Sequence, residues 1–265
     1  KIHTNTKDSI MGKKVLVVFS HPEQKSFCGG MRDAIVKGLV EAGHEVKQSD
    51  LYKMKYNPVV SQTSVKELGN KEYFNVIMEY KNAAAKGLFA DEYAAEHEKL
   101  KWCDYFILIS PYWWGSVNAM MKGWVDLTLT AGVAWDFGKI YDKGLLRGKT
   151  GMIVTSTSMP ENAYAKDGAM GMTLEDRFHH LTWGSLKFCG ADVLPTYCAY
   201  GVLSASDDAR KDMIANVVKR VKEMETAKRL YAYEHADHGK TEAKNEVKLE
   251  STSSSKKGGC CYLFQ

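Results

Sequence analysis

Several features that define other protein classes are missing from this sequence. No apolar run approaches the roughly 20 residues of a membrane-spanning helix, and residues 1–10 lack the apolar middle of a secretory signal. The net charge is +4, from 36 basic and 32 acidic residues, an excess too small to indicate a nucleic-acid-binding protein. The 6 cysteines show no paired spacing in the core, which indicates reduced thiols in a cytosolic protein.

Motifs for metal ions and for phosphate-binding loops are also missing. The sequence contains no CxxC, no HExxH, no Walker loop and no GxGxxG. The adjacent His179 and His180 would point about 100° apart on a helix, so they cannot easily chelate one ion. Cys103 and Cys189 lie in apolar surroundings, where thiols are normally buried and inert. We therefore expect neither a metal site nor cysteine catalysis.

Strand patterns and helix patterns alternate between about residues 13 and 229. Continuous apolar runs at 15–19, 105–109 and 152–154 are typical of strands buried on both faces, and further strands are expected at 45–50 and from 192 to 194 and beyond. Helical spacing occurs near 31–39, 93–101, 117–130 and 174–188, and again after Ser206, whose hydroxyl can cap a helix. This alternation predicts an α/β fold, with a five-stranded parallel sheet covered by helices on both faces.

The domain boundaries follow from composition. We expect residues 1–11 to be a disordered or added leader, because Met11-Gly12 looks like a natural start. Residues 12–235 should form the folded domain, interrupted by long connections at 51–86 and 134–147. Residues 236–265 are charged, rich in serine and lysine and poor in large apolar side chains, so we expect a disordered basic tail.

Ligands of parallel sheets bind beyond the carboxyl ends of the strands, which makes three loops candidates for the site. After the first strand, Ser20-His21-Pro22 and Lys25–Gly30 could hold a phosphate at a helix N-terminus or form a simple polar turn with a helix cap. After the third, Tyr112-Trp113-Trp114 could cover a flavin ring or a subunit interface. After the fourth, the hydroxyls of residues 155–158 suit a polar ring edge or a solvated loop.

Five stretches in this order resemble the NAD(P)H:quinone oxidoreductase family, which the similarity places over about residues 13–224. They are Lys14–Gly29 with His21 and Ser26-Phe27, Asp50-Leu51-Tyr52, Pro111–Asp126 with Trp114 and Lys122-Gly123-Trp124, Tyr141–Gly144, and Leu186–Gly190. The resemblance implies a flavodoxin-like, doubly wound domain, a homodimer with two shared active sites, and bound FAD. It also implies a ping-pong reaction, in which NADH or NADPH passes a hydride to flavin N5 and a quinone then receives it.

The resemblance also implies the roles of particular residues. FAD would be held by His21, Ser26, Phe27, Cys28, Gly29, Gly30, Asn75, Tyr112, Trp113, Trp114, Gly115, Ser156, Thr157, Ser158, Met159, Tyr164 and Arg210. Trp114, Val133, Trp135 and Phe188 would wall the substrate slot. Tyr164 would be the catalytic residue, donating a hydrogen bond toward the reduced flavin or the quinone oxygen.

This sequence departs from the family pattern at several of those places. Met170 stands where some members have a histidine that partners the tyrosine, and Ser158-Met159 replaces a pair of glycines. Cys28 replaces an asparagine, and Leu203 replaces an acidic residue near the adenosine. Trp183 and Lys187 occupy the positions of two metal-binding histidines of some members, so no metal is expected.

The tail is not part of the family pattern. Cys260 and Cys261 follow a basic stretch, and two acyl chains with a few lysines would suffice for peripheral membrane attachment. Prenylation by the CaaX rule needs a cysteine where Tyr262 stands, and an exposed tail of a cytoplasmic protein is the simpler interpretation. Two other functions stay open: reduction of azo dyes or nitroaromatics, and a flavin-binding regulatory subunit of a channel or another protein.

Overall fold

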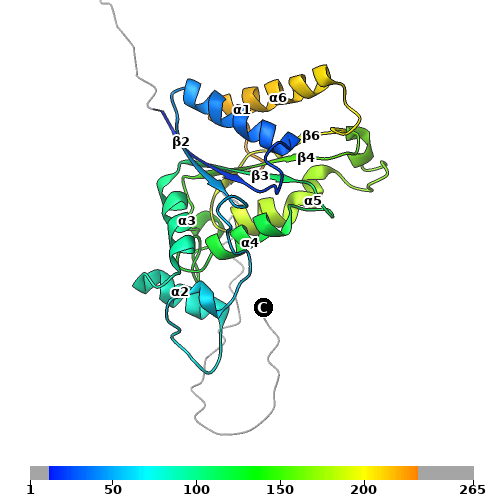
Figure 1. Cartoon of the computed structure of the whole chain (residues 1–265). Helices are drawn as coiled ribbons and strands as arrows, with labels where there is room; N and C mark the ends of the chain where they lie inside the picture. Colours follow the sequence, from blue (N-terminus) through cyan, green and yellow to red (C-terminus); the bar gives the residue numbers. More distant parts are fainter. Residues whose placement is uncertain (1–11, 232–265) are drawn as a thin grey trace, which may run out of the picture. The chain divides into compact units, whose positions relative to one another are not determined.

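The apolar runs of the sequence form the centre of one parallel sheet in the computed structural model, which describes residues 12–231 (Figure 1). β1 (Lys14–Phe19), β3 (Tyr105–Pro111) and β4 (Thr150–Ser156) lie side by side and bury nearly all of their side chains. β2 (Glu45–Asp50) pairs with β1 at one edge and is mostly exposed. The strand order is β2-β1-β3-β4-β5, all parallel, which confirms the predicted sheet.

The fifth predicted strand is present but interrupted. β5 (Asp192–Val193) and β6 (Tyr197–Ala199) both pair with β4, and Pro195 stands between them. Proline has no amide hydrogen to donate to a neighbouring strand, so the ladder breaks there. The sheet thus has six strands, and β6 extends the pairing of β4 as far as Ser156.

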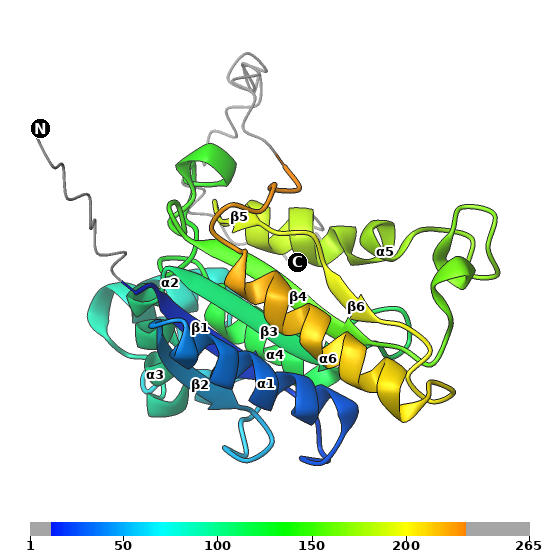
Figure 2. The ribbon, with the colours of Figure 1, turned by 90° about the horizontal axis from the view of Figure 1, so that it is seen from above.

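Helices cover both faces of the sheet (Figures 1 and 2). α1 (Phe27–Glu41) and α6 (Asp207–Lys222) lie together on one face, and their buried side chains share one apolar cluster with β1, β3 and β4. α3 (Asp91–Trp102), α4 (Ala119–Thr128) and α5 (Leu174–Leu181) cover the other face and belong to a second, larger cluster. This layering confirms the doubly wound α/β fold.

Two helix boundaries differ from the sequence prediction. α4 begins only at Ala119, because the Asn118 side chain accepts a hydrogen bond from the Met121 N–H at 3.0 Å and so caps the helix. The expected helix over 174–188 divides into α5 and a π-helix at Thr182–Lys187. This π-helix contains Trp183 and Lys187, the two positions where the family resemblance places metal-binding histidines of some members.

The long connection after β2 packs on α4 and contains a helix of its own. α2 (Val76–Lys86) begins at the capping residue Asn75 and ends at Gly87, and the sequence patterns did not predict it. Pro58 in the same connection lies so close to Gly123 that a side-chain carbon there would approach it to 2.3 Å. Glycine in the Lys122-Gly123-Trp124 motif therefore permits close packing, while Trp124 is fully buried, as expected of a core residue.

The chain after α6 returns to the sheet edge. The Leu230 N–H donates to the Val193 carbonyl at 2.8 Å, so the end of the described chain lies against β5. The Tyr231 ring packs edge-on against Trp183 with centroids 4.9 Å apart. Both termini of the sequence, 1–11 and 232–265, lie outside the described residues, and so do the expected boundary at 235 and the tail cysteines Cys260 and Cys261.

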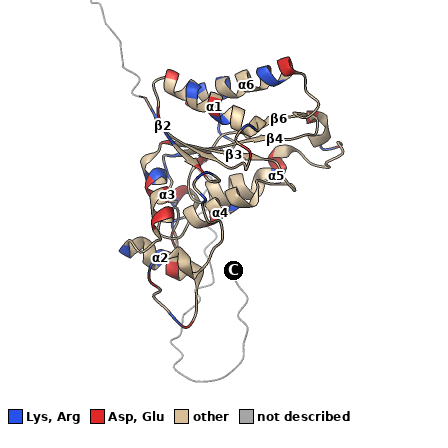
Figure 3. Cartoon of the chain, in the orientation of Figure 1, with Lys and Arg blue, Asp and Glu red and all other residues tan. Residues whose placement is uncertain are grey.

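Charges of both signs are interspersed on the outer helices. α3 and α6 each carry acidic residues in their first turn and basic residues in their last turn, an arrangement that opposes the helix dipole at both ends (Figure 3). Ser206 caps α6 by accepting a hydrogen bond from the Ala209 N–H at 3.2 Å, as the sequence predicted. Between residues 12 and 231, no helix combines the length and the apolar character needed to cross a membrane.

Candidate functional site

The loops after β1, β3 and β4 meet at the carboxyl edge of the sheet. The Cys28 Sγ lies 3.2 Å from the Ser156 Oγ, which joins the start of α1 to the end of β4. The Tyr112 N–H donates to the Ser156 carbonyl at 3.0 Å, and the rings of His21 and Trp113 lie 5.7 Å apart. Residues from all three candidate loops of the sequence are therefore neighbours in space.

The N-terminus of α1 is built to accept an anion. Ser26 caps the helix by accepting a hydrogen bond from the Gly29 N–H at 3.1 Å, and no acidic residue occupies the first turn. The positive end of the helix dipole is thus left without a negative side chain of its own. A side-chain carbon at Gly29 would lie 2.1 Å from the Gln24 carbonyl oxygen, so glycine is required for this loop to close.

His21 is held in place by the same loop. Its Nδ1 lies 3.0 Å from both the Glu23 amide nitrogen and the Glu23 carbonyl oxygen, which fixes the orientation of the ring. Burial lowers the pKa of His21, and its contacts with Glu23 oppose that shift only in part. The His21 ring is therefore placed where it can contact a phosphate bound at the start of α1.

A hollow of about 400 Å³ continues from the start of α1 to the start of α6. Arg210 stands on its wall, held by hydrogen bonds from Nε to the Val202 carbonyl at 3.0 Å and from Nη2 to the Leu203 carbonyl at 3.3 Å. Leu203 itself is exposed. The lining residues are Lys25, Ser26, Phe27, Gly30, Arg210, Lys211 and Ile214. Three of these side chains are cationic, although Arg210 pairs with Asp207 at 3.3 Å and Lys211 with Asp208 at 2.8 Å.

The aromatic loop after β3 forms a tight turn that presents its second tryptophan to solvent. Trp113 and Ser116 exchange backbone hydrogen bonds of 2.9 and 3.1 Å, which closes the turn. Trp114 has a φ of +50° and Gly115 a φ of +85°, and the side chain of Trp114 is fully exposed at 103%. A non-glycine residue in the left-handed region is uncommon and marks a conformation that the surroundings hold in place.

The loop after β4 contains a buried pair of hydroxyls. The Thr157 Oγ1 lies 2.8 Å from the Tyr164 hydroxyl, and the Tyr164 ring meets that of Tyr112 at 5.7 Å in a T-shaped contact. Burial raises the pKa of Tyr164, and the hydrogen bond with Thr157 opposes the rise. Ser158 and Met159, which follow Thr157, are exposed.

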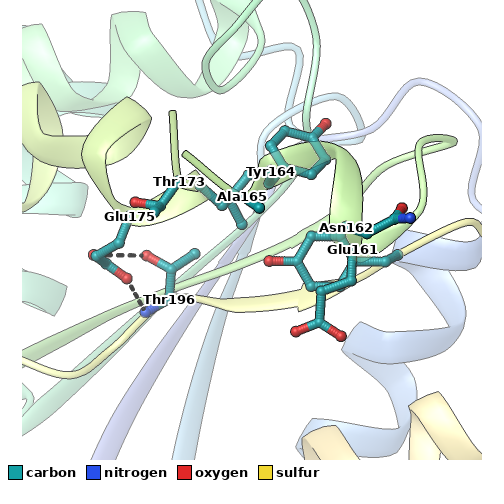
Figure 4. A pocket seen from close by; sticks show the side chains of 9 residues that line it. Glu161, Asn162, Tyr164, Ala165, Thr173, Glu175 and Thr196 are labelled. Atoms are coloured by element: carbon teal, nitrogen blue, oxygen red, sulfur yellow. Dashed lines mark hydrogen bonds between the residues drawn. The ribbon is translucent and has the colours of Figure 1, made fainter. Parts of the chain in front are cut away.

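A second hollow of about 410 Å³ lies behind Tyr164 (Figure 4). Its walls include Glu175, which accepts hydrogen bonds from Thr196 N–H at 3.0 Å and Oγ1 at 3.3 Å. Burial raises the pKa of Glu175, and both bonds oppose that rise. The Tyr164 ring forms a wall of this hollow, while its hydroxyl points away from Glu175 and Thr196. The hydroxyl is therefore directed to the loop after β4.

Two groups of predicted site residues lie away from this sheet edge within one chain. Asn75 caps α2 by accepting from the Met78 N–H at 3.2 Å, and α2 lies at the end of the subunit away from α1 and α6 (Figure 1). Trp135 and Phe188 pack together with ring centroids 5.6 Å apart, and Val133 is buried nearby in the same cluster. Trp114, being fully exposed, does not join that cluster.

The positions where some family members bind metal hold aromatic and basic side chains instead. Trp183 stacks on His179 at 6.1 Å, and Lys187 is buried with its ammonium 3.8 Å from the Asp192 carboxylate. Burial lowers the pKa of Lys187, and Asp192 opposes this. Within the part of the chain that the structure describes, no three histidine, cysteine or acidic side chains are grouped so as to hold a metal ion.

Two residues of α5 make contacts that the sequence patterns did not predict, and one of them, His180, reaches the aromatic loop. His180 donates from Nδ1 to the Arg177 carbonyl at 2.9 Å, so its Nε2 accepts the Ser116 hydroxyl at 2.9 Å. Arg177 donates from Nη2 to the Met170 carbonyl. Nothing in the sequence signals either contact, because the loop and α5 are brought together only by the layering of helices on the sheet.

Comparison with known proteins gives a consistent result. A family model described as a flavodoxin-like fold matches residues 13–223. The human ribosyldihydronicotinamide dehydrogenase [quinone] is 36% identical over 207 residues, 77% of this chain and 88% of that protein. Rat NAD(P)H dehydrogenase [quinone] 1 is 31% identical over 214 residues, 79% and 76% of the two chains. A solved structure of a proposed quinone reductase from Klebsiella pneumoniae superposes with a TM-score of 0.78 at 28% identity, covering 82% of this chain and 87% of that one.

Proposed function

Because this chain belongs to the NAD(P)H:quinone oxidoreductase family of flavodoxin-like proteins, we propose that it is an FAD-dependent enzyme that reduces quinones by two electrons from NADH or NADPH. The observation that carries the proposal is the meeting of three loops at one sheet edge. There the Ser26-capped helix, the Trp113–Ser116 turn and the Thr157–Tyr164 pair provide an anion site, an aromatic surface and a proton donor.

The residues present fit FAD and favour it over FMN. One phosphate would be accommodated by the start of α1, with its free positive dipole end, and the His21 ring is held beside it by Glu23. The cationic hollow that continues to Arg210 and Lys211 offers a place for a second phosphate and the adenosine beyond it. FMN has no group to reach that far. The remaining predicted contacts, from Tyr112 to Gly115 and from Ser156 to Met159, would border the ring.

When bound, FAD supplies the hydride chemistry, taking two electrons from the nicotinamide nucleotide and passing them to the quinone in a ping-pong sequence. The chain's own residues position the rings and handle the proton. Tyr164 has its hydroxyl at the end of the loop after β4, and Thr157 orients it at 2.8 Å. We assign Tyr164 the donation of a proton to the quinone oxygen.

A homodimer would complete the substrate slot. Trp114 is fully exposed at the edge of the site, and the Trp135–Phe188 cluster lies elsewhere on the same chain. A second copy that placed its Val133, Trp135 and Phe188 over Trp114 would give the slot the walls that the family resemblance implies, and Asn75 would then reach the FAD of the other copy. Sedimentation of the purified protein as a dimer is the expected result, and a monomer with full activity would contradict it.

The decisive experiment is a visible spectrum of the purified protein under anaerobic conditions. The flavin absorption should bleach on addition of NADH or NADPH and return on addition of menadione, which tests both half-reactions. Analysis of the flavin that is released by heating the protein then distinguishes FAD from FMN. Absence of any flavin, even after reconstitution with FAD, would overturn the proposal.

Two rival activities give different outcomes in the same experiment. A flavin that bleaches but is reoxidised faster by an azo dye or a nitroaromatic than by any quinone would assign the acceptor to those compounds. A flavin that stays oxidised in the presence of either nucleotide would indicate a regulatory subunit of a channel or another protein. Because Trp114 is fully exposed, a flavin bound next to it would stay accessible to substrates. This accessibility favours an enzyme that turns over, rather than a protein in which the flavin is buried.

For location, we propose a cytoplasmic protein, with peripheral membrane attachment only if Cys260 and Cys261 are acylated. Both cysteines lie outside the described residues, and the support comes from the basic sequence before them. Thioester-specific capture of the full-length protein from cells tests acylation directly. A serine variant at both positions should abolish the capture and leave quinone reduction unchanged.

A further inference from the structure

Arg177 on α5 connects to the loop that carries Tyr164. Its guanidinium donates from Nη2 to the carbonyl of Met170. The Met170 N–H in turn donates to the Ala163 carbonyl at 2.9 Å, so the two ends of this loop are tied together next to Tyr164. Arg177 therefore anchors a loop whose other end holds the tyrosine, and it does so through the main chain of residue 170, whatever side chain stands there.

The same guanidinium lies beneath the Trp113–Ser116 turn. A side-chain carbon at Gly115 would lie 4.0 Å from Arg177 Nη1 and 3.9 Å from the Tyr112 hydroxyl, which places both polar groups under the turn. The Tyr112 hydroxyl and Arg177 Nε are buried, and neither has a hydrogen-bond partner among the described residues. Buried polar atoms are normally paired, so these two are available to a further group or to water.

Tyr164 is surrounded by groups that disfavour its ionised form. Burial, Tyr112 in the loop after β3 and Cys198 on β6 all raise its pKa, whereas Thr157 and the positive charge of Arg177 lower it. Glu175 from α5 and Tyr200 and Glu161 face it across the second hollow. Arg177 thus supplies positive charge at a place where phenolate would otherwise be strongly disfavoured.

We propose that Arg177 is a positioning residue for proton transfer by Tyr164, because it anchors the loop and stabilises the phenolate that remains after the transfer. The proposal rests on the function proposed above. A quinone that has accepted a hydride carries an oxyanion; the Tyr164 O–H bond breaks, the proton goes to that oxygen, and a hydroquinone and a phenolate result. Water then returns the proton to Tyr164. Arg177 keeps its own proton throughout.

The test follows the ionisation of Tyr164 in the full-length protein labelled with 3-fluorotyrosine. The ¹⁹F signal of Tyr164 is assigned by its loss in Tyr164→Phe and is titrated with pH. Arg177→Gln should raise the pKa of Tyr164, because it removes a positive charge that favours the phenolate. Arg147→Gln, which removes an exposed arginine elsewhere, should leave the titration unchanged. An unchanged pKa in Arg177→Gln would overturn the proposal.

Arg177→Lys separates the two parts of the role and covers the case in which Arg177→Gln does not fold. Lysine keeps the charge but lacks the planar fork of donors, so the Tyr164 pKa should rise less than with glutamine. The anchoring of the loop should weaken, seen as faster hydrogen exchange of the Met170 amide. If both the pKa and the exchange rate stay at their wild-type values, Arg177 has no positioning role.

A further readout uses the holoenzyme. In Arg177→Gln, quinone reduction should slow by about tenfold near neutral pH, and the alkaline limb of its pH profile should move upward with the Tyr164 pKa. Reduction of the bound flavin by NAD(P)H should be little affected. Because the titration of Tyr164 needs neither flavin nor turnover, a protein that proved to bind no flavin would refute the proposed function while leaving this measurement interpretable.

Discussion

The hydroxyl of Tyr164 lies 2.8 Å from that of Thr157, across the loop that follows β4. Thr157 is fixed in turn by the ladder, because its N–H donates to the Ala199 carbonyl at 3.0 Å and its carbonyl accepts from the Val202 N–H at 3.1 Å. The tyrosine hydroxyl is thereby tied through Thr157 to the ends of β4 and β6, in addition to the anchor that Arg177 gives to its loop. A proton donor held in this way keeps one orientation toward the edge of the site.

Tyr164→Phe should slow quinone reduction by about ten- to a hundredfold, since a positioned general acid contributes at least that much. FAD should be retained, because the ring still packs on Tyr112. Stopped-flow spectroscopy of the oxidative half-reaction measures the effect. Tyr73→Phe, at an exposed tyrosine, is the control. Equal rates for wild type and Tyr164→Phe would remove the assigned role.

Gly29→Ala and Gly30→Ala form a matched pair at the start of α1. An alanine methyl at 29 would lie 2.1 Å from the Gln24 carbonyl oxygen, whereas at 30 its nearest neighbour, Ile214, is 3.9 Å away. We expect Gly29→Ala to lower the free energy of unfolding by about 1–3 kcal/mol and to weaken FAD binding. Gly30→Ala should be close to wild type in stability. Denaturant unfolding and flavin fluorescence give the two quantities, and similar behaviour of both variants would contradict the reasoning.

Glu175 predicts a particular dependence of stability on pH. Its pKa is raised in the folded protein above the ordinary value of 4.5, so the folded state binds more protons than the unfolded state just above that pH. The contribution of Glu175 to stability therefore falls as the pH rises through this window. Glu175→Gln should remove this part of the decline. Thr196→Val removes a hydrogen bond that favours the carboxylate and should steepen it, as urea unfolding between about pH 4 and pH 7 can measure.

The cysteines between residues 12 and 231 should resist alkylation in the native protein. Burial raises the pKa of Cys28 and Cys103 to about 11 and that of Cys189 to about 12, and it raises the pKa of Cys198 as well. The reactive thiolate is therefore scarce near neutral pH. Iodoacetamide labelling followed by peptide mass spectrometry should find these four modified only after unfolding. Rapid native labelling of Cys28 would show that the start of α1 opens to solvent.

The sheet could be read from the sequence because its central strands are continuous apolar runs, and buried runs have few alternatives. The runs at 15–19 and 105–109 appear in β1 and β3, and Cys103 and Cys189 are buried as predicted. The sequence patterns did not predict local interruptions of strands and helices that depend on single residues. Pro195 broke the fifth strand, and the π-helix at Thr182–Lys187 ended α5 early. Neither α2 nor its cap at Asn75 stood out from a polar connection.

Sequence patterns pointed to those residues of the candidate site that belong to a local turn. They did not point to residues whose contacts join segments that are far apart in the sequence. Ser26 and Gly29 belong to a strand-to-helix turn, which has a recognisable sequence. Arg177 and His180 show no such pattern, because their side chains contact Met170 and Ser116 only once the chain has folded. The prediction that Val133, Trp135 and Phe188 share a slot with Trp114 stays a prediction. Within one chain Trp114 does not join their cluster, so a second copy would have to bring them together.

The hydrogen bond from Leu230 to Val193 also bears on how the folded chain avoids aggregation. An uncovered strand at the rim of a sheet can recruit strands from other molecules. Here β5 is only two residues long and Leu230 occupies its Val193 carbonyl, while β2 at the opposite rim carries the charges of Glu45 and Lys47. Shortened versions of the protein should therefore remain dispersed when cut after Asp237 and should precipitate when the cut removes Leu230.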